Sequence, residues 1–159
     1  MRFAETLSEM LTAEEIRAMS GLEFITGIVT GTLPAPPICK ALNYRLFSAE
    51  KGACVFRGTP TFDAMNPIGS VHGGWFGTLL DSCMACAVQT ELAAGVMYTT
   101  LEYKINIIRP IFPDTGDYDA IGTVDHIGRR TGIAHGKIVG VDDGKTYATG
   151  TTTCLILAS

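Results

Sequence analysis

The chain has 159 residues, of which 47% are hydrophobic and 18% are charged, which suits one domain with a sizeable core and argues against disorder. Its formal net charge of −4 and its isoelectric point near 5.3 argue against a nucleic-acid-binding surface, which is normally basic, but leave room for a local cationic pocket. No run reaches about 18 apolar residues, so we expect no membrane-spanning helix and no membrane partner.

The N-terminus and the cysteines favour a cytoplasmic location. Arg2, Glu5 and Glu9 interrupt the N-terminal segment, which therefore lacks the apolar stretch of a signal peptide. The five cysteines are odd in number and scattered, apart from Cys83 and Cys86, and we expect them to be reduced thiols.

The N-terminal segment contains helix signals followed by prolines. Residues 12–21 predict a short helix, with Thr12 as N-cap, Glu15 completing a capping box and Gly21 ending the helix. The apolar stretch that follows is compatible with a second helix. It runs into prolines that favour a turn or an extended segment: Pro34, Pro36 and Pro37.

Two strands and a loop are predicted next. Residues 42–47 and 52–61 have strand composition, and the residues between them have the length of a hairpin loop. Residues 62–70 form a loop, because Asn66-Pro67 and Gly69 interrupt regular structure.

A long helix is predicted from Val71 or His72 to about Leu92. Its apolar residues recur at helical spacing, and the remaining faces carry mostly Gly, Ala and small polar residues. Such a helix is buried nearly all round. The recurring apolar residues are Phe76, Leu79, Leu80, Cys83, Met84, Ala87 and Val88.

The C-terminal third predicts four strands. Residues 99–108 alternate apolar and polar side chains, which is typical of a strand with one face in water. Three further strands are expected over 116–128, 131–141 and 145–157, and the Asp-Asp-Gly turn at 142–144 favours a hairpin between the last two.

Runs of strands on either side of one long helix predict an α+β fold with an antiparallel sheet. A curved sheet could cover most of the helix, and a second copy of the chain could cover the rest. We expect a single domain over 1–159, with an N-terminal helical extension at 1–40 and a core at 41–157.

Asp81 stands out because it interrupts the apolar run of the long helix, between residues 79–80 and 83–84. A buried carboxylate is costly unless it is paired or used. Either it faces solvent or pairs with a cation such as Arg57 or Arg109, or it lies in an apolar pocket with a raised pKa and accepts a proton.

The sequence resembles the hotdog-fold acyl-CoA thioesterases of the phenylacetate-pathway (PaaI-like) type. The resemblance covers about residues 40–157, and the L-P-A-P-P-I segment before it also fits a subgroup. It rests on N-P-I-G-S-V-H-G-G at 66–74, Asp81 nine residues after His72, T-T-L-E-Y-K-I-N-I-I-R-P at 99–110, G-R-R-T-G-I-A at 128–134 and D-D-G-K-T-Y-A-T-G-T-T-T-C at 142–154.

This resemblance implies a hotdog fold, with an antiparallel sheet of five to six strands around the long helix, and hydrolysis of an acyl-CoA to a carboxylic acid and free CoA. Asp81 would be general base or nucleophile, while Asn66 and the backbone of Gly73 would hold the thioester carbonyl. Thr100, or the adjacent Thr99, would help to place the water. Hotdog folds also serve as hydratases or dehydratases of acyl thioesters and as non-catalytic binders of acyl-CoA or aromatic ligands, and a fold does not fix its chemistry.

His72, Gly73 and Gly74 sit where the long helix begins. Small residues there permit close packing, and the free N–H groups and the positive helix end can stabilise an oxyanion or let a bulky thioester approach. We expect His72 to orient the loop or the substrate rather than act as a base. Asn66 is equally interpretable as a turn residue or as a donor to the carbonyl.

Cationic residues are candidates for the phosphates of CoA. Arg129 and Arg130, next to Gly128, form a basic pair in a predicted turn of an acidic chain, and Arg109 is a weaker candidate. No metal site is expected, since the Cys83-x-x-Cys86 pair has no second pair to complete four ligands and lies too far into the helix for a redox site. No cofactor is expected beyond the CoA of the substrate, because dinucleotide-binding, P-loop and serine-hydrolase motifs are absent.

Helix geometry predicts that the site is shared between two copies. Gly73 and Asp81 are eight residues apart, which is about 12 Å along one helix axis. One thioester cannot comfortably reach both groups of the same helix, whereas two antiparallel helices related by a two-fold axis bring Asp81 of one copy to the helix start of the other. We therefore expect a homo-oligomer, either a dimer or a dimer of dimers (a homotetramer), with the active site at the dimer interface.

Overall fold

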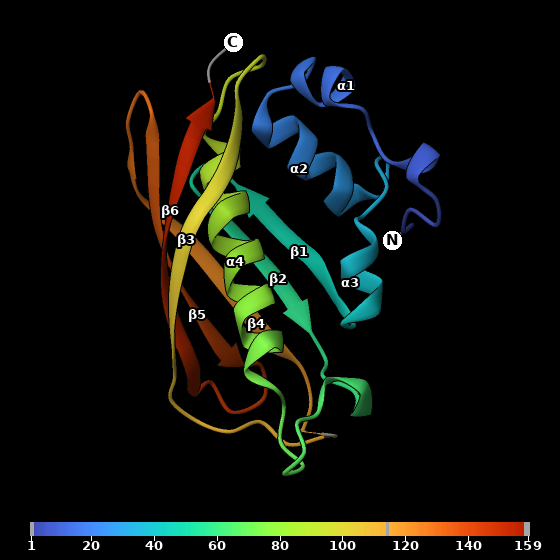
Figure 1. Cartoon of the computed structure of the whole chain (residues 1–159), viewed down its shortest axis with the longest axis vertical. Coiled ribbons are helices and arrows are strands. Elements are labelled where there is room, and N and C mark those ends of the chain that lie inside the picture. The colour runs from blue at the N-terminus through green and yellow to red at the C-terminus, as the bar shows by residue number, and fades with distance from the viewer. Residues whose placement is uncertain (1, 114, 158–159) are drawn as a thin grey trace.

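A curved antiparallel sheet wraps around one long helix in the computed structural model, which describes residues 2–113 and 115–157 (Figure 1). The predicted α+β hotdog architecture is thereby confirmed. The helices are α1 (Ala13–Arg17), α2 (Gly21–Thr30), α3 (Pro37–Ala41) and α4 (Gly73–Thr90), with short 3-10 turns η1 (Leu7–Glu9) and η2 (Phe62–Ala64). The strands are β1 (Tyr44–Glu50), β2 (Ala53–Gly58), β3 (Met97–Ile107), β4 (Tyr118–Ile127), β5 (Thr131–Gly140) and β6 (Thr146–Leu157).

The sheet has six strands in the order β1-β2-β4-β5-β6-β3, and all neighbouring strands are antiparallel. The two predicted hairpins are present, β1 with β2 and β5 with β6. In the latter, Gly144 takes the positive φ of 65° that the Asp-Asp-Gly turn indicated. Strand β3 lies at one edge of the sheet, so one row of its backbone groups is open to a further strand.

Helix α4 forms the centre of the core, as its apolar pattern predicted. Leu79, Leu80, Cys83 and Met84 are completely buried against the concave face of the sheet. The sheet approaches α4 so closely at Gly122 of β4 that an added Cβ would lie 2.2 Å from the Cys83 carbonyl oxygen. A glycine is therefore required for this strand to lie on the helix. No helix in the described part of the chain is both long and apolar enough to cross a bilayer.

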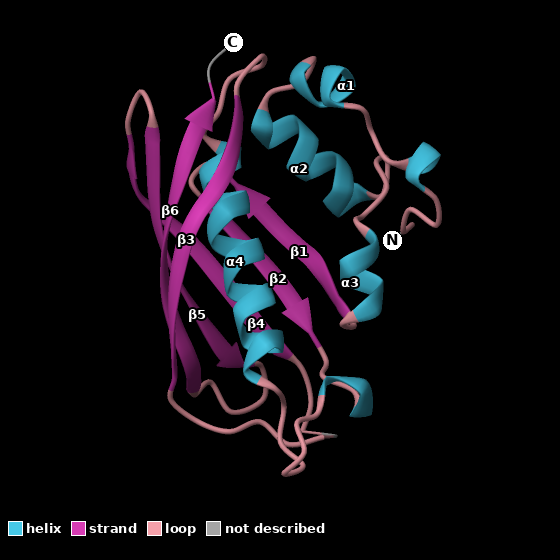
Figure 2. Ribbon diagram, in the orientation of Figure 1, coloured by secondary structure: helices cyan, strands magenta, loops and turns pink. Residues whose placement is uncertain are grey.

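Helices α1, α2 and α3 form a separate group beside the β1 edge of the sheet (Figure 2). Thr12 and Glu15 form the predicted capping box of α1. Gly21, which was expected to end that helix, instead begins α2, because Ser20 and Glu23 form a second capping box. The expectation of only a turn or extended segment at the prolines was also wrong at Pro37, which takes the first position of α3, where its missing N–H costs nothing.

Strand β3 differs most from its prediction. One face was expected to be buried, but Leu101, Tyr103 and Ile107 are 58%, 46% and 48% exposed in the single chain. A β-bulge between Thr100 and Glu102 shifts the register, so that Leu101 leaves the alternation. The alternating pattern alone did not reveal this extra residue.

Candidate active site

The carboxylate of Asp81 lies half-buried on α4, facing β3. Its Oδ1 accepts a hydrogen bond of 3.1 Å from the Thr100 hydroxyl. Burial raises the pKa of Asp81 above its usual range, and the Thr100 hydrogen bond opposes part of that rise. The carboxyl is therefore a stronger base than an exposed aspartate.

Asp81 forms no ion pair within residues 2–113 and 115–157. Arg57 instead binds Asp119 through two hydrogen bonds of 2.7 and 2.8 Å. Arg109 donates to the carbonyl oxygen of Thr146. The interpretation in which Asp81 is neutralised by Arg57 or Arg109 is therefore wrong, and its charge remains open to a ligand.

Strand β3 runs antiparallel to α4 and lines the face that carries Asp81. A Cβ added at Gly73 would contact Ile107, and one added at Gly77 would lie 3.3 Å from the Tyr103 hydroxyl. Ile107 and Tyr103 lie beyond the bulge, while Thr100 lies before it. The bulge thus lets Thr100 and the later odd-numbered residues point toward the same helix. Thr99, the alternative to Thr100, is exposed, and strand alternation places it on the opposite face.

The N-terminus of α4 offers a free donor. His72 is the N-cap, and its Nδ1 accepts a hydrogen bond of 2.8 Å from the Gly74 N–H. The Trp75 N–H donates to the His72 carbonyl oxygen at 3.0 Å. The Gly73 N–H has no acceptor in the described part of the chain. It therefore combines an unused donor with the positive end of an 18-residue helix.

Asn66 stabilises the loop that leads into this helix. Its Oδ1 accepts from the N–H groups of Ile68 and Ser70, at 3.0 and 3.2 Å, and its Nδ2 donates to the Ser70 hydroxyl at 2.8 Å. The structure therefore shows Asn66 in the role of a turn residue. One amide hydrogen of Nδ2 remains beyond the bond to Ser70, so a role as carbonyl donor stays a prediction.

The predicted phosphate-binding arginines do not come together. Arg129 and Arg130 are exposed in the β4–β5 turn, where the Gly128 N–H donates to the Thr131 carbonyl at 2.8 Å, and they border a hollow of about 420 Å³. This turn lies at the end of the sheet that carries Thr99, since Leu155 pairs with both Thr131 and Thr99.

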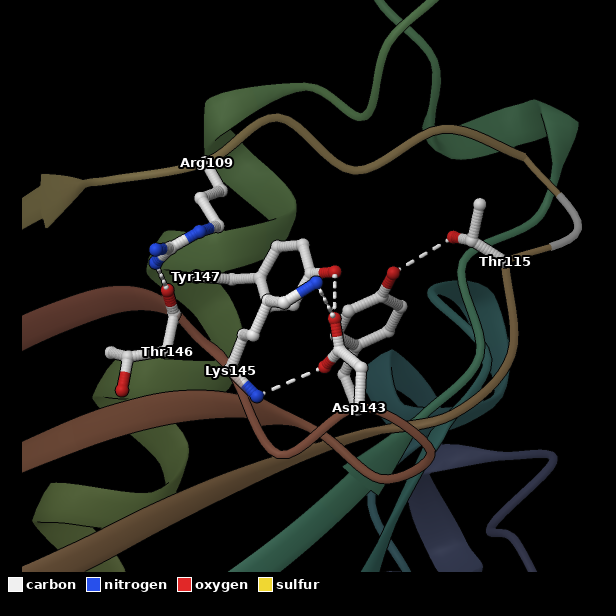
Figure 3. A network of polar contacts seen from close by, with 7 residues as sticks. Arg109, Thr115, Asp143, Lys145, Thr146 and Tyr147 are labelled. Carbon is white, nitrogen blue, oxygen red and sulfur yellow. Dashed lines mark hydrogen bonds and ion pairs between the residues drawn. The ribbon is translucent and has the colours of Figure 1, made fainter.

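Arg109 lies near the other end of β3, beside a polar network in the β5–β6 turn (Figure 3). Asp143 of that turn accepts from the Lys145 N–H at 2.9 Å and from the Tyr147 hydroxyl at 3.0 Å. The Asp143 carboxylate raises the pKa of Tyr147 to about 12. The bond to Thr146 engages the Arg109 guanidinium with the β5–β6 turn, and phosphate binding by Arg109, Arg129 or Arg130 stays a prediction.

Sequence reasoning missed three polar residues on the elements around Asp81. Tyr44 of β1 and Ser82 of α4 share a hydrogen bond of 3.1 Å between their hydroxyls. Tyr98 lies two residues before Thr100, on the same face of β3, and burial raises the pKa of its hydroxyl well above the usual range, with nearby Cys86 and Asp81 adding to the rise. Strand alternation from Thr100 could have identified Tyr98, whereas nothing local in the sequence pairs Tyr44 with Ser82.

The cysteines form no disulfide in the described residues. Cys83 is completely buried, which confirms its predicted packing role, while Cys86 is partly exposed. Burial raises the pKa of the Cys83 thiol well above its usual range, so it is inert as a nucleophile. No group of three potential metal ligands occurs in the part of the chain that the structure describes.

Comparisons with known proteins agree with this architecture. Residues 68–147 match the family profile described as the thioesterase superfamily, which is half of the chain. A search of curated proteins gave no match.

Solved structures are similar over most of the chain. A putative thioesterase, described as phenylacetic acid degradation-related, from Ralstonia eutropha is 26% identical, with a TM-score of 0.74 over 83% of this chain and 98% of that one. A mutant of the phenylacetic acid degradation protein PaaI from Thermus thermophilus is 26% identical, with a TM-score of 0.68 over 75% and 97%. A hypothetical thioesterase from Streptococcus pneumoniae, solved with coenzyme A, is 24% identical, with a TM-score of 0.66 over 74% and 88%.

The family match and these structures confirm the resemblance to PaaI-like hotdog thioesterases that the sequence motifs indicated. The chain therefore belongs to the thioesterase superfamily and is a thioester hydrolase.

Proposed function

We propose that this protein hydrolyses acyl-CoA thioesters, with Asp81 as the catalytic carboxylate. The observation that carries the proposal is the half-buried Asp81 carboxylate, which has a raised pKa, no ion pair in the described chain and one ordering hydrogen bond from Thr100. The choice of CoA as carrier is supported by the Streptococcus pneumoniae relative, whose structure contains coenzyme A.

In the proposed reaction the Gly73 N–H donates to the thioester oxygen, and Thr100 holds Oδ1 of Asp81 so that Oδ2 faces the attacking water. Asp81 takes a proton from the water as its oxygen bonds to the carbonyl carbon. The resulting oxyanion collapses, the carbon–sulfur bond breaks, and the proton returns to the CoA sulfur. The products are a carboxylic acid and free CoA. Direct attack by the Asp81 carboxylate, followed by hydrolysis of the anhydride, uses the same groups.

We further propose that each site combines two copies of the chain. Gly73 and Asp81 both lie on α4, about 12 Å apart along its axis. The exposed apolar side chains of β3, including Leu101, Tyr103 and Ile107, and the open β3 edge support a second copy packed there. Asn66 and Gly73 would come from one copy, and Asp81 and Thr100 from the other.

The direct test is release of free thiol from a panel of acyl-CoA esters, followed with a thiol reagent. We expect turnover by the wild type that needs no added metal or cofactor. Absence of thiol release from every member of the panel would contradict the assignment of CoA as the carrier.

Thr100→Val should move the acid side of the pH–rate profile to higher pH. Asp81 acts as a base only when deprotonated, so kcat/KM falls as the pH drops through its raised pKa. The Thr100 hydrogen bond lowers this pKa, and removing it raises the pKa further. Thr99→Val is the matched control, because its side chain faces away from α4 and should leave the position of the acid side unchanged. Equal shifts in the two variants would contradict the assignment of Thr100.

Exchanging both Arg129 and Arg130 for alanine should raise KM for acyl-CoA far more than it lowers kcat. These exposed guanidinium groups would bind the phosphates, far from the reacting carbon, and should hold ground and transition states alike. Steady-state kinetics tests this prediction, and Arg109→Ala serves as the comparison because Arg109 is already engaged with Thr146. An unchanged KM in the double variant would place the phosphates elsewhere.

A further inference from the structure

An apolar cavity of about 240 Å³, partly open to solvent, lies between the N-terminal helices and the hotdog core. On the core side it is lined by Leu46 of β1, Phe56 of β2, Cys86 of α4 and Tyr98 of β3. Most of the remaining lining residues come from the N-terminal segment before residue 40, including Phe24 and Ile28 of α2. The cavity therefore exists because the N-terminal helices cover this part of the core.

The N-terminal helices that cover the cavity are fixed to the core. The N–H of Gly21, at the start of α2, donates to the Leu92 carbonyl at 2.9 Å, and a Cβ at Gly21 would lie 1.7 Å from the Gln89 carbonyl oxygen. Ile25 is 1% exposed and Ile28 is 6% exposed, so α2 buries its apolar side toward the cavity. The position of α2 is thus fixed well enough to define the size of the cavity.

The lining selects an uncharged ligand. Among the described residues, no Asp, Glu, Lys, Arg or His side chain lines the cavity. Its polar side-chain groups are the Gln89 amide, the Tyr98 hydroxyl and the thiols of Cys39 and Cys86. A charged or strongly polar group would lose its hydration here without gaining partners, whereas an alkyl group would not.

The cavity begins close to the catalytic carboxylate. Tyr98 is two residues before Thr100 on β3, which is about 7 Å, and strand alternation places its side chain on the same face as Thr100, which donates to Asp81. An acyl group whose carbonyl lies at Asp81 would pass Tyr98 and extend into the cavity.

We propose that this cavity binds the tail of the acyl group, so that the preferred substrates are thioesters of unbranched medium-chain acids of about eight to ten carbons. A cavity of about 150 Å³ accommodates benzene, so the larger volume here fits most of such a chain but not a much longer one. Acetyl would not reach the cavity from Asp81, and hexadecanoyl would exceed it. This inference rests on the proposed acyl-CoA hydrolysis and assigns its acyl specificity to the N-terminal helices.

The test is kcat/KM for straight-chain acyl-CoA esters from acetyl to hexadecanoyl. Each methylene that enters the cavity should raise kcat/KM about fourfold, until the chain exceeds the available length. Ile28→Phe reduces the cavity, and the ratio of kcat/KM for octanoyl-CoA over butanoyl-CoA should fall about tenfold. Phe24→Ala enlarges it, and the ratio for dodecanoyl-CoA over octanoyl-CoA should rise. A general loss of stability cannot move the chain-length preference in opposite directions in these two variants.

Phe47→Ala is the matched control for Phe24→Ala. Phe47 follows the cavity-lining Leu46 on β1, but it is 43% exposed and packs under the Arg57 guanidinium. Its variant should keep the wild-type chain-length profile. A flat profile in the wild type, or profiles that both cavity variants leave unchanged, would overturn the cavity assignment while the hydrolase assignment stands.

Absence of turnover with every ester would overturn the proposed acyl-CoA hydrolysis instead. Calorimetric binding of octanoyl-CoA and acetyl-CoA then tests the cavity by itself. Tighter binding of octanoyl-CoA that Ile28→Phe abolishes supports the cavity as an acyl site. Equal affinities for the two esters overturn it.

Discussion

Asp81→Asn is expected to lower kcat by about 10² to 10⁴, which corresponds to about 3 to 5 kcal/mol of lost transition-state stabilisation. The amide keeps the size of the carboxyl and can still accept the Thr100 hydrogen bond through Oδ1, but it cannot take a proton from water or attack a thioester. The loss should therefore appear in kcat rather than in KM. Steady-state kinetics on a saturating acyl-CoA measures it.

The same variant should remain folded and be more stable than the wild type at neutral pH. The folded-state pKa of Asp81 is raised by burial, so the stability that its neutral form contributes at low pH is lost as the pH rises through that pKa. An uncharged asparagine removes this loss. Circular dichroism and thermal unfolding check the fold, and near-normal turnover by a folded variant would remove Asp81 from the mechanism.

Mixing Asn66→Ala with Asp81→Ala should restore about a quarter of wild-type activity, although each variant alone should be nearly inactive. A mixed dimer has one site with both Asn66 and Asp81 intact if the two residues act across the interface. Random assembly makes about half of the dimers mixed, each with one of its two sites active. This expectation holds whether Asn66 contacts the carbonyl itself or only fixes the loop before Gly73, because both belong to the same chain.

The matched control mixes the wild type with the Asn66→Ala/Asp81→Ala double variant in equal amounts. If sites span two chains, every mixed dimer is inactive, and about a quarter of the activity per total chain remains. If each site lies within one chain, about half remains. Mass spectrometry verifies subunit exchange. No recovery in the first mixture together with half activity in the second would place the site within one chain.

The local patterns of the sequence determined most of the elements. The spacing of Leu79, Leu80, Cys83 and Met84 predicted α4 because a helix buries residues at a fixed period. The Asp-Asp-Gly turn predicted the β5–β6 hairpin because its residues suit the backbone angles that the turn needs. The second capping box, Ser20 with Glu23, was readable by the same local rule.

Asp81 itself could be singled out from the sequence, because a carboxylate within an apolar helix is unusual whatever the fold. The residues that surround Asp81 could not be predicted from the sequence. The Thr100 hydrogen bond joins residues 19 positions apart, and the β-bulge that separates Thr100 from Tyr103 depends on pairing with β6. The exposed side chains of β3 alternate just as those of a half-buried strand do. Their exposure therefore depends on which elements pack against them, which the sequence pattern does not show.

The sequence by itself thus determined the elements, the family motifs and the residue with the unusual charge, because these depend on short-range periodicity and residue type. Only the tertiary structure decided that Asp81 has no cationic partner in the described chain, that Arg109 is engaged at Thr146, and that the N-terminal helices border an apolar cavity next to α4. Ion pairs and cavities arise where segments distant in sequence meet, and their distances depend on packing, which no local pattern encodes.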